Sequence, residues 1–323
     1  MDNQLRIDNA ISPAVNADFV PVDEVTTELT TVLSPITIRD FVQLAKPGII
    51  MSNLITTFGG FWMASQWSIH WELMFYTMLG TALVMASGCV LNNFLDRDLD
   101  SKMARTKQRA LPTGRIQPNL VLGYGIALGI IGTSVLGLLV NTLAALLGIL
   151  GLFVYVWIYT AWFKRTSVWS TFVGAISGAI PPVIGYCAVS ETVDAGALIL
   201  FAILFLWQPP HFWALGIRRM EEYRAAGFPL LPVVKGSFIT KISMVRYVVL
   251  LIPTTLLLFT FGYVGWIYLI SAIILGFIWL YMCIAGFKAN GDDEVRWAKN
   301  TFLYSIIYLT LLFIIIVIDT AAL

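Results

Sequence analysis

The stretch ELMFYTMLGTALVMASGCVLNNFLDRDLD, residues 72–100, decides the fold. From Leu73 to Leu95 it contains no charged residue, and three aspartates then follow within five positions. A helix needs about 20 apolar residues to cross the roughly 30 Å hydrocarbon core of a bilayer. Only helices and closed barrels satisfy every backbone hydrogen bond in lipid, and an apolar run without two-residue alternation selects a helix. We therefore predict a transmembrane helix over residues 72–95 that ends in an acidic cluster.

Working outward from this stretch, similar apolar runs recur along most of the chain. The sequence predicts an all-α integral membrane protein of about nine transmembrane helices. The expected spans lie near 48–65, 72–95, 119–140, 143–163, 171–190, 197–217, 244–262, 266–287 and 301–318. The pair Pro209-Pro210 is expected to break or kink the sixth span, because proline lacks a backbone donor.

The composition supports a membrane protein and excludes other classes. Hydrophobic residues make up 58% of the 323-residue chain and charged residues only 12%, about half of the charged fraction usual for soluble domains. The net charge of +1 gives no electrostatic basis for binding nucleic acid. The three cysteines are far apart in apolar stretches, so neither metal-site spacing nor a disulfide framework is indicated.

Residues 1–37 differ from the rest of the chain. They are rich in Asp, Glu, Thr, Asn and Pro and contain no long apolar run. Their acidic residues argue against a secretory signal and against an Arg-rich mitochondrial presequence. We predict a flexible cytoplasmic tail over 1–37, a transmembrane domain over 38–323, and a bacterial plasma membrane in preference to the mitochondrial inner membrane.

The basic residues predict the orientation. With nine spans, every Lys and Arg falls on one side: in the N-terminal segment, in the connections after spans two, four, six and eight, or, for Arg246, at the start of span seven. The opposite connections carry only His70, Glu72, Glu191 and Asp194 as titratable groups. The positive-inside rule then places the N-terminus in the cytoplasm and the C-terminus outside. The two longest connections, after spans two and six, are both cytoplasmic and highly charged, so function is expected there.

The first of these connections begins with an acidic motif. Asn92, Asp96 and Asp100 are spaced by four, so on a helix they share one face at the cytoplasmic end of the second span. Mg²⁺ takes one or two carboxylates and completes its octahedron with water and phosphate oxygens. Aspartate at the bilayer edge is costly unless it is paired or bound to a metal. The motif therefore predicts a Mg²⁺–diphosphate site, whereas Asp98 points elsewhere.

Basic residues near this motif are candidates for binding the diphosphate. Arginine can grip phosphate oxygens in bidentate fashion. The alternative is that these residues only set the topology. The candidates are Lys102, Arg105, Arg109, Lys164, Arg165 and Arg218.

The second charged connection follows Trp207-Gln208-Pro209-Pro210-His211-Phe212. If a helix resumes after the prolines, His211, Arg218 and Glu222 share one face. His211 is open to three interpretations: a ligand of heme iron, a proton acceptor, or a hydrogen-bond partner of a neighbouring helix. Glu222, with Glu221 beside it, is a candidate ligand for a second Mg²⁺.

These motifs resemble a known family. Asn92-x-x-x-Asp96-x-x-x-Asp100 followed by Met103-Ala104-Arg105-Thr106 and Arg109 resembles the first signature of the UbiA superfamily of intramembrane prenyltransferases. The chain is most similar to the branch of that superfamily that acts on heme, over about residues 38–318. The further segments that carry this resemblance are 159–165, 178–182, 207–212 running on to Tyr223, 226–233 and 296–299.

The resemblance implies a fold and a reaction. It implies nine helices around a central cavity, dependence on Mg²⁺, and farnesyl diphosphate and heme B as substrates. The implied mechanism is departure of diphosphate, attack of a heme vinyl group on the allylic cation and addition of water, with catalytic roles for Asp96, Asp100, Lys164 and His211. Aromatic walls, for example Trp157, Trp162 and Trp207, are expected to shield the cation. A heme A synthase or a terminal oxidase is the implied downstream partner.

Three other functions compete with this interpretation. A UbiA-type transferase acting on an aromatic quinone precursor is the main alternative, although sister families carry an Asp-x-x-x-Asp second motif that is absent here. A transporter is disfavoured, because the acidic residues cluster at one face of the membrane instead of at its midplane. A non-catalytic heme-binding assembly factor would not need the Asn-x-x-x-Asp-x-x-x-Asp face.

Overall fold

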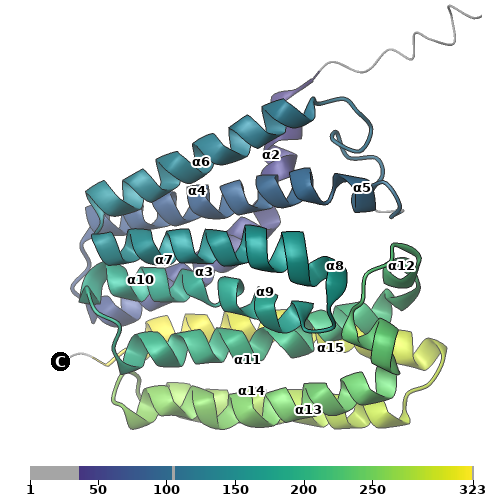
Figure 1. The fold of residues 1–323 in the computed structure, drawn as a ribbon. Coiled ribbons are helices and arrows are strands. Elements are labelled where there is room, and N and C mark those ends of the chain that lie inside the picture. Colours follow the sequence, from purple (N-terminus) through teal and green to yellow (C-terminus); the bar gives the residue numbers. More distant parts are fainter. Residues whose placement is uncertain (1–35, 104–105, 322–323) are drawn as a thin grey trace, which may run out of the picture. The chain divides into compact units, whose positions relative to one another are not determined.

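The computed structural model describes residues 36–103 and 106–321, and within them the fold is helical. Figure 1 shows the helices running side by side, with short connections at both ends. The elements are α2 (Ile38–Ala45), α3 (Pro47–Ser65), α4 (Trp71–Leu95), α5 (Arg97–Asp100), α6 (Pro118–Leu139), α7 (Thr142–Phe153), the π-helix η1 (Val154–Phe163), α8 (Lys164–Thr166), α9 (Ser170–Gly178), α10 (Ile180–Ser190), α11 (Ala195–Arg218), α12 (Met220–Ala225), α13 (Leu231–Thr260), α14 (Trp266–Ala285), the 3₁₀ turn η2 (Gly286–Lys288) and α15 (Asp292–Ile318).

The protein is a multi-span membrane protein. Within the described ranges, eight helical units are long and apolar enough to cross a bilayer, and they coincide with eight of the predicted spans. The remaining predicted span, 48–65, corresponds to α3, which has 19 residues but is less apolar than the other eight helical units. Its polar residues have a structural reason, since Ser52, Asn53 and Thr56 line an internal cavity. The prediction of about nine spans therefore agrees with the structure.

Two predicted boundaries are wrong, and the sixth span is not broken at its prolines. Helix α13 begins at Leu231 instead of near residue 244 and is kinked at Gly236, which has a φ of 79°, and α15 begins at Asp292 instead of near 301. Both helices extend past the apolar run into polar sequence, which hydropathy alone does not detect. Helix α11 continues without interruption through Pro209-Pro210. Neighbouring groups can satisfy the carbonyls that proline leaves free in a transmembrane helix.

Small residues allow the helices on one side of the structure to pack closely. A Cβ atom on Gly60 of α3 would collide with the carbonyl oxygen of Pro182 in α10, and one on Gly185 of α10 would collide with the carbonyl oxygen of Thr57. The same holds between α6 and α4, where a Cβ on Gly132 would lie 2.7 Å from the backbone nitrogen of Val84. Close backbone approach through small residues is the usual way that helices associate in lipid.

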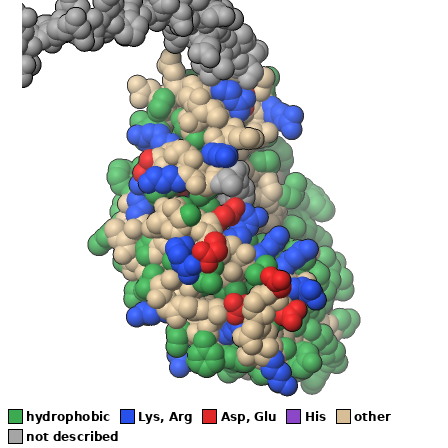
Figure 2. All heavy atoms as spheres, turned by 90° about the vertical axis from the view of Figure 1, so that its right-hand side faces the viewer, with side chains coloured by type: hydrophobic (Ala, Val, Ile, Leu, Met, Phe, Trp, Pro, Cys, Tyr) green, Lys and Arg blue, Asp and Glu red, His purple; other side chains and the backbone are tan. Residues whose placement is uncertain are grey.

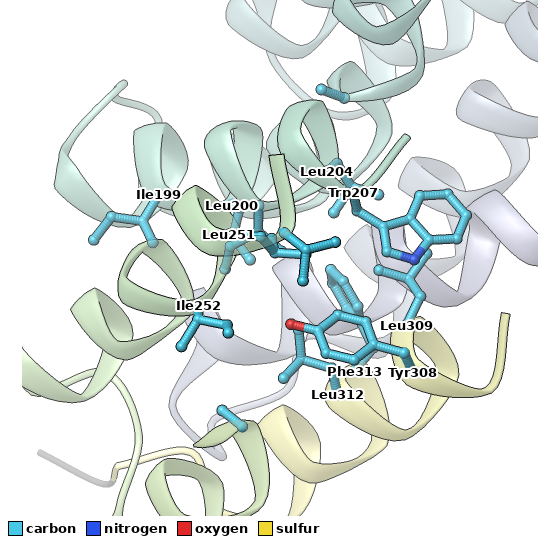
Figure 3. Packing of buried hydrophobic residues seen from close by; sticks show 14 of the residues in the cluster. Ile199, Leu200, Leu204, Trp207, Leu251, Ile252, Tyr308, Leu309, Leu312 and Phe313 are labelled. Carbon is cyan, nitrogen blue, oxygen red and sulfur yellow. The ribbon is translucent and has the colours of Figure 1, made fainter. Parts of the chain in front are cut away.

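The other side is held by a core of large side chains. Figure 3 shows Leu200 and Leu204 of α11 packing with Leu251 of α13 and with Leu312 and Phe313 of α15. Trp207 of α11 reaches α15 through its ring nitrogen, which donates to the carbonyl of Ser305 at 2.8 Å. Helices α11 and α15 are therefore joined by both apolar packing and hydrogen bonding.

A substitution at the α3–α10 contact tests this packing. We expect Gly60→Ala to lower the free energy of unfolding by about 1–3 kcal/mol, the usual cost of overpacking. The matched control is Gly123→Ala, because a Cβ at this helical position meets no atom within 4 Å. The control is expected to be neutral or slightly stabilising, since alanine favours a helix over glycine. Thermal unfolding in detergent measures both, and equal stability of the two variants would contradict the close contact.

Candidate active site

The acidic motif lies at one end of an internal cavity. Asn92 is near the end of α4, Asp96 caps that helix, and Asp100 ends α5. The backbone keeps a near-helical path, because the amide of Asp96 donates to the carbonyl of Asn92 and the amide of Asp100 to that of Asp96. All three side chains are buried and line a cavity of about 700 Å³. The structure thus places them together on one surface.

Three basic side chains face this motif, one for each of its members. The ammonium of Lys46 donates to Asn92 Oδ1 at 2.6 Å, Lys164 pairs with Asp96 Oδ2, and Arg109 pairs with Asp100 at 2.9 Å. All three bases line the cavity. A buried carboxylate is costly without a partner of opposite charge, so Lys164 and Arg109 neutralise the two acids, and Lys46, on the neutral Asn92, leaves one positive charge in excess. They also supply the positive charge that a diphosphate needs.

Lys46 is a residue of this site that the sequence did not reveal. It precedes α3 and lies in a different connection from the acidic motif. Burial lowers the pKa of Lys46 to about 8, so its side chain is largely protonated at neutral pH. In the sequence it resembles any other basic residue at a helix end, and only its contact with Asn92 distinguishes it.

The motif has the properties of a cation site. Asp96 Oδ1 is buried and has no hydrogen-bond partner, and Arg165 Nη2 lies 3.5 Å from it. An unpaired buried carboxylate oxygen is unfavourable unless something binds it. No group of three or more His, Cys, Asp or Glu side chains with metal-site geometry occurs in the described part of the chain. The donor set of two carboxylates and one amide is the kind that Mg²⁺ accepts, because Mg²⁺ retains water and phosphate ligands.

Asp98 lies outside the cavity, as the helical spacing predicted. Both of its carboxylate oxygens accept hydrogen bonds from Arg165, at 2.9 and 3.0 Å. This guanidinium holds the pKa of Asp98 below its usual range. Arg165 also donates to the carbonyl of Leu95. Arg165 therefore joins α8 to the end of α4 on the surface, beside the cavity instead of in it.

The π-helix η1 shapes the wall opposite the motif. Its i→i+5 hydrogen bonding makes each turn wider than that of an α-helix. As a result, Tyr155, Tyr159 and Lys164, at intervals of four and five residues, all line the cavity. The two tyrosine rings stack with centroids 5.6 Å apart, and the Lys164 ammonium lies 5.2 Å from the centre of the Phe228 ring.

The aromatic residues that line the cavity differ from those expected. Trp157 and Trp162 are 62% and 61% exposed and are directed out of the structure, so their expected role is wrong. Trp207 does line the cavity, together with Tyr155 and Tyr159. Tyr155 and Tyr159, four residues apart, would share a face in an α-helix as well, whereas Lys164, five residues further along, joins that face only through the wider turns of the π-helix.

His211 lies in the same cavity on α11, but two residues expected beside it do not. Arg218 is in the same helix as His211, about two turns further along the same face, but it does not line the cavity. The backbone bends at Arg219 before α12, so Glu222 does not continue that face. Glu222 pairs with Arg219 at 3.1 Å and does not line the cavity. The structure therefore gives no support to Glu222 as a ligand for the metal.

The remaining predicted bases fall outside the cavity or outside the described residues. Lys102 is exposed, and neither it nor Arg218 belongs to the cavity wall. Arg105 lies outside the described residues. Figure 2 shows the end of the structure that carries α5, α8 and α12, where basic and acidic side chains gather.

Beyond the motif the cavity is mainly apolar. It extends along α4 from Asp96 to Thr81, roughly 22 Å at 1.5 Å per residue. Leu152, Ile180 and Ile184 line its deeper part. The cavity therefore combines a charged end with an apolar tunnel, as expected for a membrane-embedded enzyme acting on a substrate with a phosphorylated head and a hydrocarbon tail.

Comparison with known proteins agrees with this class. A sequence profile described as "UbiA prenyltransferase family" matches residues 53–307. The chain therefore belongs to the UbiA prenyltransferase family and is a transferase. It is 54% identical over 297 residues to "Protoheme IX farnesyltransferase 1" of Bacillus subtilis (strain 168), covering 88% of this chain and 91% of that protein. It is 48% identical over 281 residues to "Protoheme IX farnesyltransferase" of Aeromonas salmonicida (strain A449), covering 87% of this chain and 95% of the relative.

Solved structures share the fold at low sequence identity. A digeranylgeranylglyceryl phosphate synthase superposes with a TM-score of 0.73 at 19% identity, covering 87% of this chain and 98% of that structure. A UbiA homolog from Archaeoglobus fulgidus, bound to GPP and Mg²⁺, superposes with a TM-score of 0.64 at 15% identity, covering 86% and 99%. The arrangement of helices is therefore that of the family.

The pairing of Asp96 with Lys164 can be tested through stability. We expect Lys164→Met to lower the free energy of unfolding by about 3–5 kcal/mol, because it leaves a buried carboxylate without its partner. The double variant Lys164→Met/Asp96→Leu is expected to recover much of this loss. Arg224→Met is the control, since its partner Glu221 is 78% exposed and an exposed pair contributes at most about 1 kcal/mol. Unfolding in detergent measures the stability of each variant. An equal loss of stability in Lys164→Met and Arg224→Met would contradict the pairing of Asp96 with Lys164.

Proposed function

We propose that this protein transfers a farnesyl group from farnesyl diphosphate to a vinyl group of protoheme IX. Water is added in the same reaction, and the products are heme O and diphosphate. The observation that carries the proposal is the buried Asn92–Asp96–Asp100 surface, faced by three bases, at the head of an apolar cavity. The choice of heme as acceptor is supported by relatives named protoheme IX farnesyltransferase at 46–54% identity.

Asn92, Asp96 and Asp100 are proposed to hold Mg²⁺. Their oxygens belong to the type of ligand that Mg²⁺ prefers, and one of them, Asp96 Oδ1, has no hydrogen-bond partner. When bound, Mg²⁺ neutralises the diphosphate oxygens and makes diphosphate a better leaving group. The structural neighbour from Archaeoglobus fulgidus bound to GPP and Mg²⁺ supports this assignment.

The bases of the chain are proposed to stabilise the leaving group. Lys46, Lys164 and Arg109 surround the head of the cavity, where the substrate diphosphate binds. As the C1–O bond of farnesyl diphosphate breaks, its electron pair stays with the diphosphate. Positive charge placed in advance around that developing negative charge lowers the barrier, and this is usually the largest catalytic effect of a site.

The apolar part of the cavity is proposed to protect the cation until heme reacts. Tyr155 and Tyr159 present ring faces near Lys164, where they stabilise positive charge and exclude water. The π electrons of the heme vinyl group then form a carbon–carbon bond to C1 of the farnesyl cation. One water molecule adds to the resulting cation beside the porphyrin ring and releases one proton, which leaves a hydroxyl group.

The protein is proposed to lie in a bacterial plasma membrane with its N-terminus in the cytoplasm. The segregation of all Lys and Arg residues to one set of connections supports this orientation. The bacterial sources of the relatives support the location. The hydroxyethylfarnesyl heme would be passed to an enzyme that oxidises it further, a heme A synthase, or to a terminal oxidase.

The three aspartates of one motif provide a matched test of this function. Heme extracted from cells that overproduce the protein is expected to gain the mass of one farnesyl group and one water. Asp96→Ala and Asp100→Ala are expected to reduce this product at least about 100-fold, because each removes a ligand of the leaving group's counter-ion. Asp98→Ala, which lies outside the cavity, is expected to retain activity within about threefold. Mass spectrometry of the extracted heme measures the amount of product made by the wild type and by each of the three variants.

Two results would contradict the proposal. Unshifted heme from cells with folded wild-type protein would exclude heme as the acceptor and would favour a quinone precursor, which the same extract would reveal as a prenylated aromatic acid. Full activity of folded Asp96→Ala would exclude the proposed metal site.

The Mg²⁺ dependence of activity distinguishes the acidic motif Asn92–Asp96–Asp100 from Glu222 as the source of metal ligands. Treatment of the purified protein with EDTA is expected to abolish product formation, and added Mg²⁺ to restore it. Asp100→Asn is expected to raise the Mg²⁺ concentration for half-maximal activity at least about tenfold, since a neutral amide binds this cation less strongly than a carboxylate. Glu222→Gln, outside the cavity, is expected to leave it unchanged. A shift for Glu222→Gln as large as that for Asp100→Asn would contradict the assigned ligand set.

A further inference from the structure

The imidazole of His211 is held rigidly in the wall of the cavity. Its ring is stacked between Trp207 of the same helix and Phe302 of α15, with centroid distances of 4.5 and 4.6 Å and interplanar angles of 21° and 28°. The side chain is 9% exposed. Both ring faces are therefore covered, and only the edges of the imidazole remain for other interactions.

Hydrogen bonds at one edge determine which nitrogen carries the proton. His211 Nδ1 lies 2.6 Å from Ser305 Oγ. The single hydroxyl hydrogen of Ser305 is donated to the carbonyl of Phe302, also at 2.6 Å. Ser305 Oγ is thus left as an acceptor, and His211 must donate to it from Nδ1–H. The neutral imidazole then has its lone pair on Nε2.

Nothing in the described part of the chain hydrogen-bonds to Nε2, and His211 belongs to the cavity wall. The nearby wall on α11 and α15 is mainly apolar and includes Phe212, Ile306 and Leu309. These groups offer little to hold a water molecule at Nε2, because a buried water needs two to four polar partners. A flat, largely apolar molecule with a Lewis-acidic centre suits this surface better.

We propose that His211 Nε2 is an axial ligand of the iron of the heme substrate, and that Ser305 is a positioning residue that fixes its tautomer. The inference rests on the proposed function, since it concerns the acceptor of that reaction. Histidine that ligates a metal almost always donates its other ring N–H to an acceptor, which sets the tautomer and the ring orientation. Neutral imidazole is also the common protein ligand of heme iron. In this role Nε2 donates its lone pair to iron, and no proton is transferred.

This ligand would fix the macrocycle in the cavity. Because the imidazole cannot rotate, the heme plane must lie across the line from Nε2 to iron, beside the aromatic wall of α11 and α15. The charged motif, on α4 and α5, and its bases Lys46, Arg109 and Lys164 lie at the head of the same cavity. The ligand thus holds one substrate while the motif holds the other, and orientation of two reactants is a large source of rate acceleration.

The experiment is resonance Raman spectroscopy of ferrous heme added to the purified full-length protein in detergent. The wild type is expected to show an iron–histidine stretching band. His211→Ala is expected to lose this band and to bind heme at least about tenfold more weakly, and added imidazole is expected to restore the band. His70→Ala removes the only other histidine of the chain, which precedes α4, and is expected to leave the band unchanged.

Two further variants separate ligation from folding and positioning. His211→Cys keeps a side chain that can bind iron, and its ferric heme is expected to show the spectrum of a thiolate ligand. Ser305→Ala is expected to keep the iron–histidine band but to shift it to lower frequency, because Nδ1–H loses its acceptor and the imidazole becomes a weaker donor. A residue with only a packing role would not shift this band.

The possible results distinguish this inference from the proposed function. An iron–histidine band that persists in His211→Ala, or its absence from heme-bound wild type, would overturn the inference and leave the function intact. Loss of product in His211→Ala with an unchanged heme spectrum would assign His211 as a base instead. Failure of the wild type to bind heme at all would overturn both.

Discussion

Burial of charge at the end of a membrane span is the constraint on which the site depends. Asp96 caps α4 at 2% exposure, where an isolated carboxylate would be strongly unfavourable. Its pairing with Lys164 ties α4 to the end of the π-helical segment, and the neighbouring pairs of Asp100 with Arg109 and of Asn92 with Lys46 extend the same arrangement. The result is a site in which both carboxylates are paired with bases and one carboxylate oxygen, Asp96 Oδ1, has no hydrogen-bond partner.

The rest of the cavity depends on how closely the helices approach each other. Glycines allow α3 to pack against α10 and α4 against α6 at backbone distance, whereas large side chains separate α11 from α13 and α15. The π-helix turns Tyr155 and Tyr159 inward while Trp157 remains outside. A cavity of about 700 Å³ is therefore kept open inside a closely packed structure.

The two ends of the site have different chemistry because they lie on different helices. The head of the cavity is formed by acidic side chains of α4 and α5 and by basic side chains from the start of α3, the α5–α6 connection and α8. The wall formed by α11 and α15 is aromatic, with His211 clamped between Trp207 and Phe302. Separate elements thus hold the anionic and the aromatic substrate that the proposed reaction brings together.

Apolarity and spacing are properties of the chain itself, so the sequence alone determined the spans, their number and the shared face of Asn92, Asp96 and Asp100. It also singled out Lys164 and His211. Tertiary structure decided which other side chains reach the cavity: Lys46 does, while Arg218 and Glu222 do not. These outcomes depend on contacts between distant helices and, for Glu222, on a bend at Arg219. The periodicity of a single helix does not predict which side chains reach the cavity, because that depends on how the helix packs against its neighbours.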